Sequence, residues 1–190
     1  MMNLFRRDRE KQIVDMFDRG DAQAMNCLYT EYAAKLTGVG SRYISDEEVL
    51  KDVLQESFIK IFTHMDSFEY RGKGSLEAWL KRIVVNEALH YLRDEKGNLT
   101  ISIEDEKVEL KEEEEPDVSN LSSEVIGSFI QKLPPGYRTV FNLYAIEGKS
   151  HKEIANILQI KADTSASQYH RAKAMLADMI NAYKCKEAEE

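Results

Sequence analysis

The sequence has no apolar run close to the roughly 20 residues needed to cross a bilayer, so no membrane-spanning helix is expected. Its first residues, MMNLFRRDREKQ, lack the apolar core of a secretory signal, which argues against export. Cysteine is scarce as well, because Cys27 and Cys185 are the only two in 190 residues and fit no metal-spacing pattern. These absences favour a chain that works in a reducing cytoplasm, without membrane insertion.

Arrangements typical of catalysis are also missing. The sequence places no Cys partner and no Ser-His-Asp arrangement around its four histidines, His64, His90, His151 and His170. The acidic clusters at residues 47–48 and 112–115 lack the spacing of a metal site. We therefore expect no catalytic residue, no metal and no cofactor, and the chain is not predicted to be an enzyme.

The net charge of −8 is concentrated in one segment. Residues 95–122 contain 10 acidic and 3 basic side chains, whereas the parts on either side are close to neutral. The segment has a Gly-Asn break, a Glu run, a proline and few apolar residues, so it is predicted to be an acidic flexible linker over residues 95–121.

On both sides of this linker, apolar residues recur at spacings of three and four, which is typical of helices. The fold class is therefore all-α, with two small helical domains at residues 1–94 and 122–190. Gly20 is expected to separate two helices, and Gly148 to end another. Ser45 is predicted to cap a helix, because Glu48 follows it at capping-box spacing. Helices are expected within residues 9–36 (two), 45–65, 75–93, 121–133, 134–148, 150–159 and 163–184.

The stretch EYRGKGS, residues 69–75, combines glycines with cations. A phosphate-binding loop would need G-x-x-x-x-G-K-[ST] after a strand, but Lys73 is followed by Gly74 and no strand is predicted before it. In the helix that follows, six side chains share a sector of about 80° at 100° per residue: Ser75, Trp79, Arg82, Asn86, His90 and Arg93. Cations contact phosphates, while amides and aromatic rings pair with or stack on exposed bases, so this polar stripe suggests a nucleic-acid surface. Taken alone, Trp79 is better interpreted as a core residue, and only the whole stripe together with the loop favours nucleic acid.

The segment SHKEIANILQIKADTSASQYHRAKAML, residues 150–176, has the dimensions of a helix-turn-helix. On its second helix the polar side chains Thr164, Ser167 and Arg171 lie opposite an apolar face, with Gln168 at the boundary. Such a polar outer face is what reading of the DNA major groove requires. An ordinary amphipathic helix pair would show the same pattern.

Together these pieces resemble a bacterial RNA polymerase sigma factor of the extracytoplasmic-function type. The resemblance runs through residues 20–94 and 122–180. It is carried by GDAQAMNCLYTEY with VLKDVLQESFIKIFTHMDSF, by GSLEAWLKRIVVNEALHYLRD, and by LPPGYRTVFNLYAIEGKSHKEIANIL with TSASQYHRAKAML. It implies a non-enzymatic subunit that brings core polymerase to a promoter and opens the DNA.

The resemblance also implies roles for matching residues. Core polymerase would be contacted by Asp52, Gln55, Glu56, Phe58 and Lys60. The single strand of the minus-ten element would be held by Arg71, Lys73, Ser75, Trp79, Arg82, Asn86 and Arg93. Duplex DNA at the minus-thirty-five element would be contacted by Arg138, Lys152, Thr164, Ser167, Gln168 and Arg171. An anti-sigma factor is a further possible partner, and the acidic linker would lie near the RNA exit path of the polymerase.

The turn of the helix-turn-helix departs from the family pattern. Gln159 occupies the usual glycine position, where a left-handed conformation costs roughly 1 kcal/mol. Lys161 stands where the family usually has a Ser-type helix cap. Ser165 lies on the core-facing side, where an aliphatic residue is common. Ala166 stands where a basic residue is frequent. Two rival functions are a free-standing helix-turn-helix regulator and a protein that titrates another factor. The first domain argues against a simple regulator, which has no need of a strand-melting surface.

Overall fold

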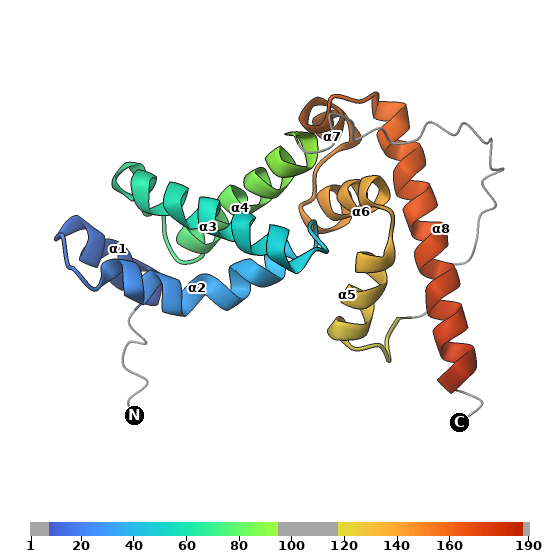
Figure 1. The fold of residues 1–190 in the computed structure, drawn as a ribbon, viewed down its shortest axis with the longest axis horizontal. Coiled ribbons are helices and arrows are strands. Elements are labelled where there is room, and N and C mark those ends of the chain that lie inside the picture. Colours follow the sequence, from blue (N-terminus) through green and yellow to red (C-terminus); the bar gives the residue numbers. More distant parts are fainter. Residues whose placement is uncertain (1–7, 95–117, 188–190) are drawn as a thin grey trace. The chain divides into compact units, whose positions relative to one another are not determined.

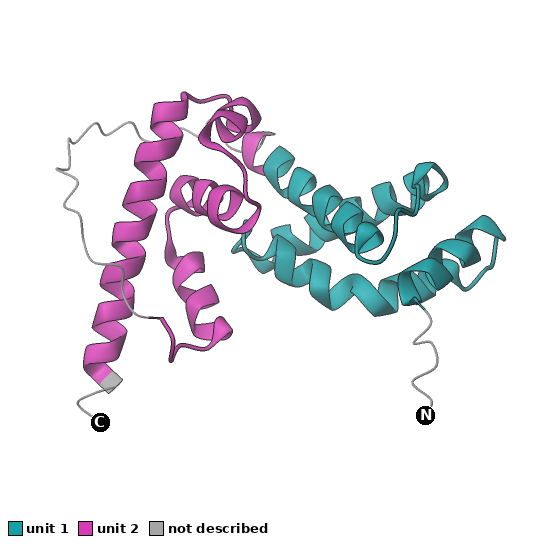
Figure 2. Cartoon of the chain, turned by 180° about the vertical axis from the view of Figure 1, so that it is seen from behind, with its two compact units in different colours: residues 1–91 teal, residues 92–190 magenta. Residues whose placement is uncertain are grey.

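The computed structural model describes residues 8–94 and 118–187, and all regular elements in these ranges are helical (Figure 1). This confirms the all-α prediction. The chain divides into two compact units, residues 1–91 and 92–190 (Figure 2). Most of the predicted linker, residues 95–117, lies outside the described residues.

Residues 8–94 form four α-helices and a short 3-10 turn, and the last of these helices runs three residues past the end of the first unit. They are α1 (Arg9–Asp18), α2 (Ala24–Gly40), α3 (Glu47–His64), η1 (Met65–Ser67) and α4 (Ser75–Asp94). Their apolar faces form a shared core that includes the fully buried Leu28, Leu36, Ile61, Leu80 and Val84. Gly20, at φ 66°, separates α1 from α2 as predicted.

The predicted cap of α3 was wrong by one residue. The side chain of Asp46, not Ser45, accepts hydrogen bonds from the backbone N–H groups of Glu48 and Val49, at 3.0 and 3.1 Å. A carboxylate is the better acceptor at a helix N-terminus, because its charge also interacts favourably with the helix dipole.

The second unit contains α5 (Ser123–Lys132), α6 (Pro135–Phe141), a π-helical turn η2 (Asn142–Ile146), α7 (His151–Leu158) and α8 (Ala162–Glu187). Its core joins α5 to α8 through Phe129, Ile130, Leu133, Ala172, Leu176 and Ile180. The single helix predicted over residues 134–148 widens at η2, where the Glu147 N–H bonds the Asn142 carbonyl at 2.9 Å. The wider turn places Leu143 in the core and leaves Tyr144 exposed, and Gly148 ends the segment as predicted, at φ 66°.

Candidate nucleic-acid interface

Residues 69–74, called the basic loop below, present two exposed cations immediately before α4. Arg71 and Lys73 are both exposed, and the Arg71 guanidinium makes a solvated ion pair with Glu69 at 3.2 Å. Gly72 and Gly74 adopt φ of 115° and 91°, conformations that other residues rarely adopt. The Ser75 hydroxyl donates to the Gly72 carbonyl at 2.6 Å and accepts from the Arg71 N–H at 3.2 Å. The loop is therefore folded back onto the start of α4.

Two carboxylates of α1 bind the same loop. Glu10 accepts hydrogen bonds from the backbone N–H groups of Gly74 and Leu76, at 2.8 and 3.2 Å. Asp8 accepts a hydrogen bond from the Tyr70 hydroxyl. Neither residue was expected at this surface from the sequence, because their partners lie 62 to 66 positions away and no local pattern marks such a contact.

The polar stripe of α4 lies on one face of the helix. Arg82, Asn86, His90 and Arg93 are exposed, whereas the other faces bury Leu76, Leu80, Val84, Ala88 and Leu92. The basic loop therefore leads directly into the helix, α4, that carries the polar stripe.

Trp79 is neither fully buried nor fully exposed. Its ring contacts the Phe68 ring, with 5.1 Å between centroids. Phe68 directly precedes the basic loop, so this contact joins the loop to the stripe. Part of the indole remains accessible, which leaves a surface on which a base can stack.

Of the residues predicted to contact polymerase, Asp52, Gln55, Glu56 and Lys60 are exposed on α3, whereas Phe58 is only 9% exposed. The Lys60 ammonium makes an ion pair with Glu87 of α4 at 2.7 Å. This contact explains a charged residue in the apolar sector of α4, for which the sequence offers no reason.

An apolar groove of about 710 Å³ runs between α2 and α3 beside these residues. Its lining includes Tyr29, Gln55, Phe58, Ile59 and Phe62, and Tyr29 and Ile59 are 53% and 50% exposed. Tyr29 and Ile59 were not expected as contact residues from the sequence, although an aromatic and an aliphatic residue off the main apolar stripe are a usable signal of an interaction surface.

The helix-turn-helix is formed by α7 and α8, as predicted. Gln159 adopts φ 57° and ψ 40°, the left-handed conformation expected at the glycine position. Among the described residues it is the only one other than glycine with positive φ. Ser165 is fully buried, and its hydroxyl lies 3.0 Å from the His151 Nδ1, so this polar residue at an aliphatic position has a hydrogen-bonding partner. Helix α8 begins at Ala162, which places Lys161 at the cap position.

The residues predicted to contact the minus-thirty-five element divide into two groups. Lys152 and Ser167 are exposed, Thr164 and Arg171 are half-buried, and the Arg171 guanidinium donates to the Tyr137 hydroxyl at 3.2 Å. Arg138 and Gln168 are each only 3% exposed. The structure therefore does not present these two as surface contacts.

The buried positions of Arg138 and Gln168 have a physical basis in packing between helices. The Arg138 guanidinium donates to the Gln131 carbonyl at 2.7 Å, bridging α5 and α6, and burial lowers the pKa of Arg138. Gln168 lies on the side of α8 that other helices of the unit cover. A helical projection of one helix placed it at a boundary and carries no information about these neighbours.

Within the described ranges, no cluster of three or more His, Cys, Asp or Glu side chains is suited to hold a metal ion. No described helix is long and apolar enough to cross a membrane.

Two protein-family models match the chain. Sigma-70 region 2 matches residues 28–97, and sigma-70 region 4 matches residues 123–176. The first match includes the basic loop and the polar stripe. The second includes the helix-turn-helix segment, residues 150–176.

Several characterised proteins are similar over most of their length. The ECF RNA polymerase sigma-E factor of Haemophilus influenzae is 33% identical, across 90% of this chain and 95% of the relative. That of Escherichia coli K12 is also 33% identical, across 90% and 94%, and the RNA polymerase sigma-H factor of Pseudomonas aeruginosa is 31% identical, across 87% and 91%.

Solved structures with detectable similarity include CnrH in complex with the cytosolic domain of CnrY, at TM-score 0.49 and 23% identity, across 92% of this chain and 99% of that one. The sigma factor RpoE in complex with the anti-sigma factor NepR from Bartonella quintana aligns at TM-score 0.47 and 20% identity, across 84% and 98%.

Proposed function

The chain belongs to the extracytoplasmic-function type of RNA polymerase sigma factors, which direct polymerase to promoters, and we propose which of its surfaces perform each step. The proposed division follows the sequence: residues 1–94 bind core polymerase and open the minus-ten element, and residues 122–190 contact the minus-thirty-five element. The site of action is the cytoplasm, where core polymerase and promoter DNA are found.

The minus-ten surface consists of the basic loop and the polar stripe. The observation that carries this proposal is that Arg82, Asn86 and Arg93 are exposed on one face of α4, directly beyond the exposed Arg71 and Lys73. The cations neutralise phosphates of the non-paired strand, and the Asn86 amide and the accessible part of Trp79 face its bases. Ser75 holds the loop against α4 rather than contacting DNA, because its hydroxyl is engaged by Gly72 and Arg71.

The polymerase surface consists of the exposed face of α3 together with the groove between α2 and α3. Asp52, Gln55 and Glu56 supply polar contacts on this face. Ile59 and Tyr29 supply exposed apolar area, which a partner removes from water on binding. Phe58 lines the floor of the groove and Lys60 contributes the part of its side chain that the Glu87 pair leaves accessible.

The minus-thirty-five surface consists of the outer face of α8 near its start and the exposed Lys152 of α7. Thr164, Ser167 and Arg171 retain the accessibility that contacts with duplex DNA require, and Lys152 is placed for a phosphate. An anti-sigma factor is a further proposed partner, as the family resemblance implies.

Reconstitution with core polymerase tests these assignments. The purified chain should direct initiation at a defined promoter, which transcript sequencing after overexpression identifies. Arg82→Ala and Asn86→Ala should reduce promoter opening while leaving core affinity unchanged, and Ile59→Asp should reduce core affinity. Failure of the wild-type chain to associate with core polymerase would contradict the proposal as a whole, and parallel loss of opening and core affinity in the α4 variants would show that these residues are structural.

A further inference from the structure

We propose that Glu10 is a positioning residue for promoter opening, through which the first helix sets the orientation of the basic loop and the start of α4. This inference rests on the proposed function of the minus-ten surface. It assigns a role to α1, which lies ahead of the region 2 match at residues 28–97.

The first turn of α4 has no capping side chain of its own. Helix α4 begins at Ser75, so the residue before it is Gly74, which carries no oxygen to accept a hydrogen bond. The first four N–H groups of a helix need acceptors from outside the helix. Glu10 supplies one from 64 residues away, at 2.8 Å from the Gly74 nitrogen and 3.2 Å from the Leu76 nitrogen. A residue of α1 thus replaces the local cap of α4.

The Glu10 carboxylate is well suited to this position. It is 7% exposed, and a negative charge at a helix N-terminus interacts favourably with the helix dipole. Burial raises the pKa of the neighbouring Tyr32 phenol above its ordinary value, and the Glu10 carboxylate raises it further. Removal of the Glu10 carboxylate would leave the N–H groups of Gly74 and of the buried Leu76 without this acceptor, and the cost falls mainly on Leu76, because Gly74 is exposed to water.

A second contact fixes the other end of the loop. The Asp8 carboxylate accepts from the Tyr70 hydroxyl and also caps α1 through the backbone N–H groups of Glu10 and Lys11, at 3.1 and 3.4 Å. Arg71 and Lys73 lie between these two contacts, at Tyr70 and Gly74. Because both ends of so short a loop are bound to α1, these contacts restrain the backbone that carries Arg71 and Lys73 relative to the polar stripe.

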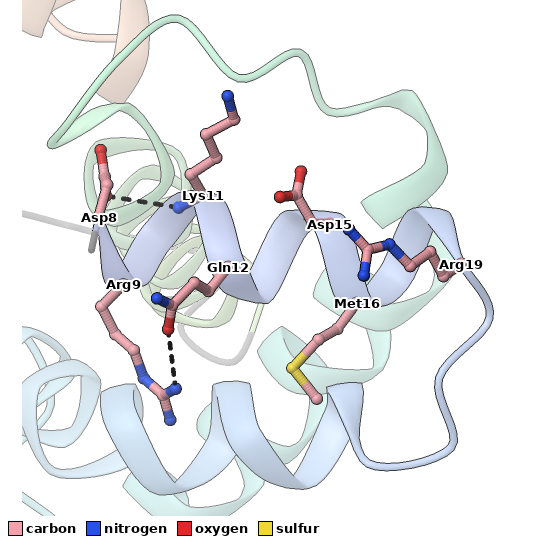
Figure 3. A pocket seen from close by; sticks show the side chains of 7 residues that line it. All are labelled: Asp8, Arg9, Lys11, Gln12, Asp15, Met16 and Arg19. Carbon is pink, nitrogen blue, oxygen red and sulfur yellow. Dashed lines mark hydrogen bonds between the residues drawn. The ribbon is translucent and has the colours of Figure 1, made fainter.

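Promoter opening by the reconstituted holoenzyme, measured with a fluorescent base at the minus-ten element, tests this role. We expect Glu10→Ala to reduce the rate of opening roughly tenfold, because loosely held contacts lose orientation, with core affinity within about twofold of wild type. Glu10→Gln keeps an acceptor oxygen and should restore most of the activity. Asp15→Ala is the matched control, since Asp15 lies on the open side of the same helix with Lys11 and Arg19 (Figure 3).

A combined variant separates failure of this inference from failure of the proposed minus-ten surface. If Arg71→Ala with Lys73→Ala leaves opening unchanged, the loop is not a DNA contact and both assignments fall. If that pair reduces opening and Glu10→Ala does not, only the role of Glu10 is overturned. Positioning of the loop also predicts that Glu10→Ala reduces opening less in the background lacking both cations than in the wild type. Equal reductions in the two backgrounds, or an equal loss of core affinity, would show a merely structural role.

Discussion

The Lys60 ammonium of α3 lies 2.7 Å from the Glu87 carboxylate of α4, and the Glu87 side chain is only 14% exposed. This ion pair joins the helix proposed to contact polymerase to the helix proposed to melt the promoter. The pair should contribute to stability, because the mostly buried Glu87 carboxylate would remain poorly solvated if Lys60 were removed.

Lys60→Ala should therefore lower the free energy of unfolding by about 1 kcal/mol, a value reduced from that of a buried pair because Lys60 is 47% exposed. Urea denaturation measures it. Lys51→Ala is the control, because the Lys51–Glu48 pair has side chains 66% and 83% exposed and should contribute less than about 0.5 kcal/mol. If the two variants lowered the free energy of unfolding equally, the burial of Glu87 would not strengthen its ion pair.

Ser165→Ala should destabilise the second unit by about 1 kcal/mol, since it removes the buried hydroxyl that lies 3.0 Å from the His151 Nδ1. Thermal denaturation of the full chain gives the value. Ser167→Ala provides the comparison, because Ser167 is exposed and its hydroxyl bonds only carbonyls of its own helix. A Ser165→Ala variant as stable as the Ser167→Ala variant would contradict a structural role for this bond.

Gln159→Gly should stabilise the protein by about 0.5 kcal/mol or slightly more. Glycine relieves the left-handed strain at φ 57°, but it loses more conformational entropy on folding and the side-chain bond to the Asn156 carbonyl at 3.2 Å. Differential scanning calorimetry should show a higher melting temperature. A lower one would mean that the Asn156 bond outweighs the strain.

The Asp8–Tyr70 bond should make stability depend on pH in acid. The Tyr70 hydroxyl is the main cause that lowers the pKa of Asp8 below its ordinary value of 3.8, so the contribution is complete above that value and is lost as pH falls through the lower, folded pKa. The stability difference between wild type and Asp8→Asn should be constant from about pH 7 to pH 5 and shrink below about pH 4. Urea denaturation across this pH range measures the difference. In a Tyr70→Phe background, the stability difference caused by Asp8→Asn should be much smaller.

The helices and the helix-turn-helix could be predicted because periodicity and turn residues are local signals. Gly20 and Gly148 interrupt helices where the sequence placed them, and the left-handed turn falls at Gln159. The cap of α3 was harder to locate, since Ser45 and Asp46 are adjacent and both residue types are common caps, whereas the structure shows Asp46 as the acceptor.

Contacts between distant segments could not be predicted in the same way. Glu10 has no feature in the sequence that marks its contact, and Glu87 stands in an apolar sector without a visible partner, because their partners lie 64 and 27 positions away, respectively. Arg138 and Gln168 were assigned to the surface from the residue types of a family pattern, whereas neighbouring helices of the unit bury them. A helical projection describes one helix at a time, and burial is decided by the helices around it.

The left-handed Gln159 also bears on how such proteins are detected. A pattern search that demanded glycine at this position would reject the chain, although its backbone makes the same turn that glycine makes and returns the Ile160 N–H to the Ala155 carbonyl at 3.0 Å. The turn is defined by its conformation, and the residue type is only a proxy whose replacement costs about 1 kcal/mol. Searches that score backbone geometry would therefore retain family members that letter patterns discard.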